Sequence, residues 1–162
     1  MKKDILSNTL IAMAVVLLAG CTSNDPEKLI VGTWEGVSRV EKDNQTLIQT
    51  EFNYETQTVS YYLDEQLQES NEYPFKETLT LSEDGKLTEI ITEEDEVWSI
   101  FEANYKLEKR GHELWLLCSN EAMTAELQIQ SLTEHELVLV STKLILDKAD
   151  NSDYTLVTTH KR

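Results

Sequence analysis

The chain predicts an all-β fold, a single antiparallel up-and-down β-barrel of about 8–10 strands with a short helical turn before the first strand. Short runs alternate apolar and polar residues with a period of two, and polar turns of a few residues separate these runs. Almost no stretch shows the helical period of three to four. So many strands in an open sheet would expose edges that aggregate, and closure into a barrel removes those edges.

The elements follow from local signals in chain order. Asp25 and Pro26 supply an N-cap and a first-turn proline, which predict one helical turn, and a second short helix is expected over 119–124. Asp84-Gly85 supplies the backbone conformation of a tight hairpin. The strands expected between the turn signals are 32–40, 46–54, 57–63, 78–81, 87–92, 103–108, 113–118, 126–132, 137–146 and 154–160.

Two segments stand apart from this regular pattern. The acidic cluster Glu93-Glu94-Asp95-Glu96 is expected to be a solvated turn. The long polar region 40–74 carries several tyrosines, among them Tyr54, Tyr61 and Tyr62, and three interpretations stay open: a lid, a pair of extended strands, or a variable connection.

The N-terminus has the pattern of an export signal. Lys2 and Lys3 precede an apolar run over 10–18, which is too short for a permanent membrane span and ends in Leu18-Ala19-Gly20-Cys21. The segment resembles the signal peptides of bacterial lipoproteins. This resemblance implies cleavage before Cys21, attachment of diacylglycerol and palmitate there, and outer-membrane localisation because Thr22 replaces a retaining Asp. An ordinary secretory signal or a transmembrane anchor are the alternatives, and the face of the membrane stays open.

The expected organisation is therefore a signal peptide over 1–20, an acylated cysteine and tether over 21–27, and one domain over 28–162. Residues 21–162 carry 12 basic and 29 acidic residues, a net charge of −17. This charge opposes binding to nucleic acid and to anionic headgroups, so the membrane contact is expected through the lipid on Cys21. With Cys21 acylated, Cys118 has no disulfide partner, and its apolar strand predicts a buried, inert thiol.

The domain resembles the lipocalin-like lipoproteins, which are related in shape to the calycins. The residues that carry the resemblance are Gly32-Thr33-Trp34 at the first strand, the 79–88 hairpin, Asn104-Tyr105-Lys106-Leu107, and 132–139. The resemblance implies that Trp34 plugs one end of the barrel. It also implies that a cation near the last strand, Lys161 or Arg162, lies over the indole, a contact worth up to about 2 kcal/mol when desolvated.

The favoured function is binding of a small apolar molecule inside the barrel. The alternative is a structural or interaction lipoprotein with a solid core and a protein partner, and an enzyme is the minority interpretation. We expect no catalytic residues, no metal and no cofactor, because His112, His135 and His160 fall in separate turns or chain ends and are expected to be solvated. Strand parity places these candidate ligand-binding residues in the interior: Trp34, Leu79, Leu81, Trp98, Tyr105, Leu114, Leu116, Leu127, Ile129 and Leu139.

Overall fold

The computed structural model describes residues 25–146, 149–150 and 154–162, without side chains over 142–150. One short helix, α1 (Pro26–Ile30), precedes the strands, and the side chain of Asp25 accepts a hydrogen bond from the Glu27 amide, as expected of an N-cap. The strands are β1 (Gly32–Asp43), β2 (Ile48–Asn53), β3 (Thr58–Leu63), β4 (Gln66–Glu72), β5 (Phe75–Leu81), β6 (Lys86–Glu93), β7 (Glu96–Arg110), β8 (Glu113–Ser119), β9 (Met123–Leu132), β10 (Glu136–Leu146), β11 (Ala149–Asp150) and β12 (Tyr154–Lys161).

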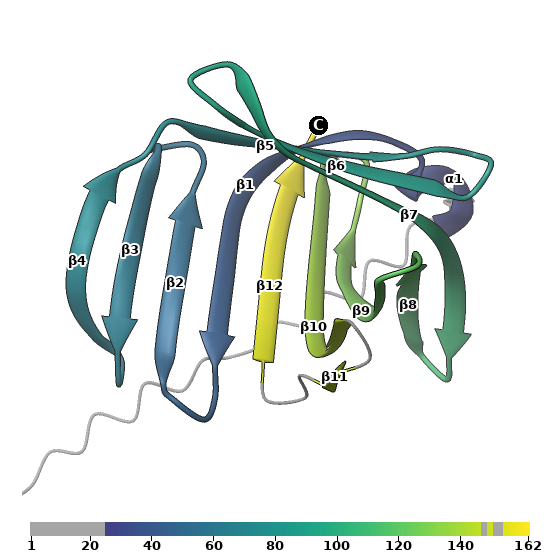
Figure 1. The fold of residues 1–162 in the computed structure, drawn as a ribbon. Coiled ribbons are helices and arrows are strands. Elements are labelled where there is room, and N and C mark those ends of the chain that lie inside the picture. The colour runs from purple at the N-terminus through teal and green to yellow at the C-terminus, as the bar shows by residue number, and fades with distance from the viewer. Residues whose placement is uncertain (1–24, 147–148, 151–153) are drawn as a thin grey trace, which may run out of the picture.

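Eight of these strands close into an antiparallel barrel, which confirms the predicted fold class. Going round the barrel, the order is β1, β5, β6, β7, β8, β9, β10 and β12. The ring closes because β12 pairs with both β10 and β1. Figure 1 shows β5, β6 and β7 crossing over the ends of the remaining barrel strands.

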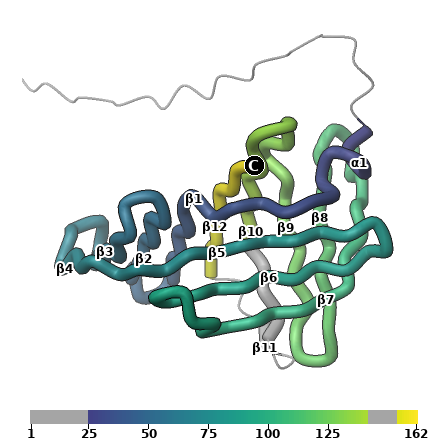
Figure 2. Tube along the Cα trace, turned by 90° about the horizontal axis from the view of Figure 1, so that it is seen from above, coloured from purple at the N-terminus to yellow at the C-terminus, as the bar shows by residue number. Residues whose placement is uncertain are grey.

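The region 40–74 forms a sheet extension that leaves the barrel. β1 pairs with β5 through residues 32–35 and, further along the same edge, with β2 through residues 38–42. β3 and β4 continue outward from β2 as a meander, which projects beyond the barrel in Figure 2. Extended strands are therefore the correct interpretation of this region, although three strands are inserted rather than two.

Two local predictions were wrong. Residues 66–72 form β4, an all-exposed strand whose polar side chains lack the apolar alternation on which the strand predictions rested. Residues 119–124 contain no helix: the Asn120 side chain accepts hydrogen bonds from the Ala122 and Met123 amides and makes a turn between β8 and β9. The acidic segment at 93–96 is confirmed as a turn, in which Glu94 and Asp95 have positive φ.

Trp34 closes one end of the barrel, next to α1. Its indole is fully buried and donates a hydrogen bond to the Ile30 carbonyl at 2.9 Å. The Arg162 guanidinium lies 4.1 Å from the centre of the indole ring, and it donates to the carbonyls of Leu29, Val31 and Glu134. Arg162, and not Lys161, is therefore the cation over Trp34.

The backbone beside the contact between Arg162 and Trp34 requires a glycine at position 32. Its φ of +136° favours glycine, and a Cβ there would lie 3.0 Å from the Arg162 guanidinium.

The signal peptide, Cys21 and the start of the tether lie outside the described residues. Within the part of the chain that the structure describes, no helix has the length and apolar character needed to cross a membrane.

Candidate functional site

A cavity of about 850 Å³ lies inside the barrel. All eight barrel strands contribute residues to its lining, and β2 adds Phe52 from the sheet extension. Trp98 lines the cavity although 64% of its surface is exposed, so this residue lies where the cavity meets solvent. The other apolar lining residues are Phe52, Phe75, Leu79, Leu87, Ile91, Phe101, Cys118, Met123, Ala125, Leu127, Leu139 and Leu156.

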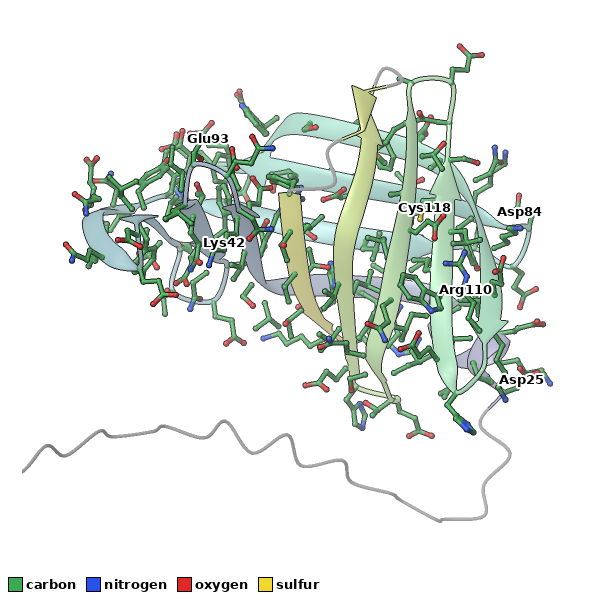
Figure 3. All side chains as sticks on the ribbon, turned by 90° about the horizontal axis from the view of Figure 1, so that it is seen from below. Asp25, Lys42, Asp84, Glu93, Arg110 and Cys118 are labelled. Carbon is green, nitrogen blue, oxygen red and sulfur yellow. The ribbon has the colours of Figure 1, made fainter. Side chains whose placement is uncertain are left out.

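The cavity extends from the closed end, where Leu79 pairs with Trp34, toward the other end of the molecule. In Figure 3, Asp25 at the start of α1 and Lys42 near the end of β1 lie on opposite sides. Asp43, the neighbour of Lys42 and the last residue of β1, lines the cavity.

Four of the ten residues predicted from strand parity line the cavity: Leu79, Trp98, Leu127 and Leu139. The other six do not. Trp34, Leu81 and Leu116 are fully buried in the core, and Ile129 packs against this core. Tyr105 donates its hydroxyl to the Ser82 carbonyl near the β5–β6 turn, and Leu114 lies near the β7–β8 turn. Strand parity identifies the face of the strand on which a side chain lies, but not its position along the barrel axis. For this reason these six residues were predicted to line the cavity but do not.

A charged cluster that strand parity did not predict lies in the cavity wall. Glu77 of β5 is 4% exposed and accepts hydrogen bonds from the Tyr54 hydroxyl and from His160 Nε2, the latter at 2.8 Å. The guanidinium of Arg39 donates to Glu41 and Glu89, each at 2.6 Å, and its Nη1 lies 3.8 Å from Glu77.

The charge state of Glu77 follows from these contacts. Burial alone would raise the pKa of Glu77, but the hydrogen bond and charge of His160, the charge of Arg39 and the Tyr54 hydroxyl together lower it. Glu77 is therefore an ionised acceptor, so His160 Nε2 carries the proton in their hydrogen bond. His160 Nδ1 is then left buried and without a hydrogen-bond partner among the residues that the structure describes.

The pKa values of the neighbouring groups, Glu89 and Arg39, are raised rather than lowered. Burial and the charge of Glu77 raise the pKa of Glu89, and Arg39 only partly opposes them. For Arg39, burial lowers the pKa, but Glu89, Glu77 and Glu41 outweigh burial and raise it. Arg39 is therefore a permanent cation among three carboxyl groups.

Gly36 allows the cluster to form. A Cβ at Gly36 would lie 2.8 Å from Glu77 Cβ and 2.9 Å from the ring of Tyr54. These contacts are shorter than a Cβ tolerates, so any larger residue would push Tyr54 or Glu77 away. Gly36 also lies at the irregularity in the β1–β12 register.

The outcome for the other candidate residues is mixed. Cys118 is 2% exposed, and burial raises the pKa of its thiol to about 12, which confirms the prediction of a shielded cysteine. His112 and His135 are exposed as expected, but the prediction for His160 was wrong because its strand parity directs it inward. Among the residues that the structure describes, no group of three or more His, Cys, Asp and Glu side chains is placed to hold a metal ion.

A sequence signal for the charged cluster does exist. Glu77 alternates with Phe75, Leu79 and Leu81, and all four are buried. A charged residue at an inward position of an otherwise apolar strand indicates a buried polar site. His160 shares its parity with Leu156 in the same way, and both line the cavity.

These features define the molecule as a closed antiparallel barrel, which fits a lipocalin-like fold, with an internal, mostly apolar cavity and a buried charged cluster. No protein-family model matches the chain, and no curated protein matches it.

Proposed function

We propose that this chain is a lipid-anchored envelope lipoprotein whose barrel binds a small, largely apolar molecule. The observation that carries the proposal is the cavity, whose volume of about 850 Å³ is within the range of roughly 300–1,000 Å³ typical of ligand pockets. Apolar and aromatic side chains with a few polar groups line it, which is the usual composition of such a site. The proposed role is binding rather than catalysis. The cavity also argues against the alternative of a solid barrel.

Ligand binding is tested by dye uptake. The core residues of the described structure run from Ile30 to Leu139, so the test protein starts at residue 21, which retains all of them, and carries Cys21→Ser. We expect saturable binding of an environment-sensitive apolar dye. Leu139→Phe adds a larger side chain to a cavity-lining position and should weaken dye binding, whereas Val138→Phe, on the other face of the same strand, should not. Equal effects of the two variants, or no saturable binding, would contradict a ligand cavity.

The lipid anchor is supported by the export signal that ends at Cys21, and it is tested by labelling cells with palmitate. The wild-type protein should incorporate the label and Cys21→Ser should not. Cys118→Ser is the matched control and should be labelled like the wild type, because it leaves Cys21 in place. Label that persists in Cys21→Ser would contradict acylation at this residue.

A further inference from the structure

The charges in the cavity wall do not balance. Arg39 is the cation of the cluster, and it faces the carboxyl groups of Glu41, Glu77 and Glu89. These three carboxyl groups outnumber Arg39 by two when all are ionised. This excess of negative charge is local, because all four residues line the same cavity.

Arg39 is already engaged with carboxylates. Its Nε donates to Glu41 and its Nη1 to Glu89, both at 2.6 Å. An anionic ligand that approached Arg39 would therefore lie next to carboxylates in a partly desolvated site, where like charges repel more strongly than in water. The arrangement disfavours fatty acids and other carboxylates as ligands.

Glu89 has capacity left for a ligand, whereas Glu77 does not. Both oxygens of Glu77 are occupied, by Tyr54 and by His160, and its side chain is only 2% accessible. The side chain of Glu89 is 21% accessible, and among the described residues its hydrogen-bond partner is Arg39. Burial and the charge of Glu77 raise the pKa of Glu89, so Arg39 only partly compensates its negative charge.

A second polar atom of the cavity wall has capacity for a ligand. His160 is 2% exposed and lines the cavity, and among the described residues its Nδ1 has no hydrogen-bond partner. Because Nε2 is engaged with Glu77, Nδ1 is the ring atom whose hydrogen bond a ligand can complete. Glu89 and His160 Nδ1 are thus two polar groups of the same cavity wall that the described residues leave incompletely satisfied.

We propose, building on the function proposed above, that the cavity binds an amphiphile with a cationic hydrogen-bond donor, such as a protonated amine, and that Glu89 pairs with this group. The hydrocarbon part lies against the apolar lining, where Phe101, Leu127 and Leu139 are available. A charge-assisted hydrogen bond between an ammonium group and Glu89 then supplies orientation and specificity.

The test compares three ligands with the same hydrocarbon chain: dodecylamine, dodecanol and dodecanoate. Each displaces the apolar dye from the protein that starts at residue 21 with Cys21→Ser, at neutral pH and below micelle-forming concentrations. We expect dodecylamine to bind at one site per chain, about tenfold or more tighter than dodecanoate, with dodecanol in between.

Glu89→Gln tests the assigned partner. It should reduce the affinity for dodecylamine by about fivefold or more and leave the affinity for dodecanol nearly unchanged, because only the ammonium group pairs with the carboxylate. Glu102→Gln is the matched control: it removes the same charge from an exposed position on β7 and should leave both affinities unchanged. A similar loss in both variants would mean that the net charge of the protein attracts the amine, which would overturn the assignment of Glu89.

The outcomes separate the two proposals. Dodecanoate binding as tightly as dodecylamine, or more tightly, would overturn the cationic ligand class and leave the proposed binding function intact. Binding of neither the dye nor any of the three ligands would overturn the binding function itself. If Glu89→Gln fails to fold, the order of the three ligands on the unsubstituted barrel still decides the question.

Discussion

The two ends of the barrel use their polar groups differently. At the closed end, Trp34 and Arg162 donate to the backbone carbonyls of Ile30, Leu29, Val31 and Glu134, and the guanidinium lies on the indole. In the cavity, three carboxyl groups surround one guanidinium, and His160 Nδ1 has no hydrogen-bond partner in the described part of the chain. The closed end is thus arranged for stability, whereas the cavity retains charge that the fold alone does not compensate. This is the pattern expected of a binding site.

The largest expected effect is at the closed end. Trp34→Ala removes a fully buried indole and should lower the free energy of unfolding by about 3–5 kcal/mol. Urea denaturation at neutral pH measures this loss. Trp98→Ala is the control, because Trp98 is mostly exposed and should cost far less. Equal losses for the two variants would show that Trp34 does not hold the closed end.

Glu77→Gln should have the next largest effect, about 1–3 kcal/mol at neutral pH, because it weakens charged hydrogen bonds in a buried site. The pKa of Glu77 is lowered by folding, so its ionised form contributes stability above the usual carboxyl pKa. That contribution is lost as the pH falls through the lowered pKa. The difference between wild type and variant should therefore shrink on acidification, and a difference that grows instead would contradict the assigned charge state.

Arg162→Ala should cost about 1–2 kcal/mol, since it removes a cation–π contact and hydrogen bonds to three carbonyls. Trp34 fluorescence should change in the same variant. Lys161→Ala is the adjacent control. Lys161 pairs with Glu55 at the surface, so its removal should affect neither stability nor fluorescence appreciably. A larger loss of stability in Lys161→Ala than in Arg162→Ala would contradict the assignment of Arg162 as the cation over Trp34.

The smallest expected effect is that of Glu89→Gln. Folding raises the pKa of Glu89, so the group favours the folded state at low pH, and this contribution is lost as the pH rises through the raised pKa. At neutral pH, the neutral glutamine should therefore leave the unfolding free energy unchanged or slightly higher. Urea denaturation of the variant at pH 7 checks this. A loss as large as that of Glu77→Gln would show that Glu89 serves the fold and weaken the contrast between the two ends.

The closed end could be predicted because the resemblance to lipocalin-like lipoproteins implied a plugging Trp34 and a cation at position 161 or 162, and the residues that carry this part of the resemblance are close in sequence. Pro26, Gly32 and Trp34 lie within nine residues of each other, and the cation is the last residue of the chain. The alternation of apolar residues likewise predicted the barrel, because burying one face of each strand imposes that period.

The charged cluster could not be predicted in the same way. Glu77 and His160 are 83 residues apart and meet only because β1 brings β5 and β12 to its two sides. Tyr54 reaches Glu77 from just beyond β2, over the bare backbone of Gly36, and no sequence pattern specifies that packing. The inserted strand β4 was missed for a simpler reason: it buries nothing, so it has no apolar alternation to detect.

The position of α1 determines which end of a lipid-anchored barrel would point toward the membrane. α1 lies next to Trp34, and Figure 1 shows it at the opposite side of the molecule from β4. Asp25 follows Cys21 by four positions, and an extended chain over four residue steps spans at most about 14 Å. A lipid on Cys21 would thus hold the indole-plugged base near the bilayer and turn the entrance beside Trp98 toward the aqueous side. Ligands would then arrive from solution or from another protein, and not directly from the leaflet that holds the anchor.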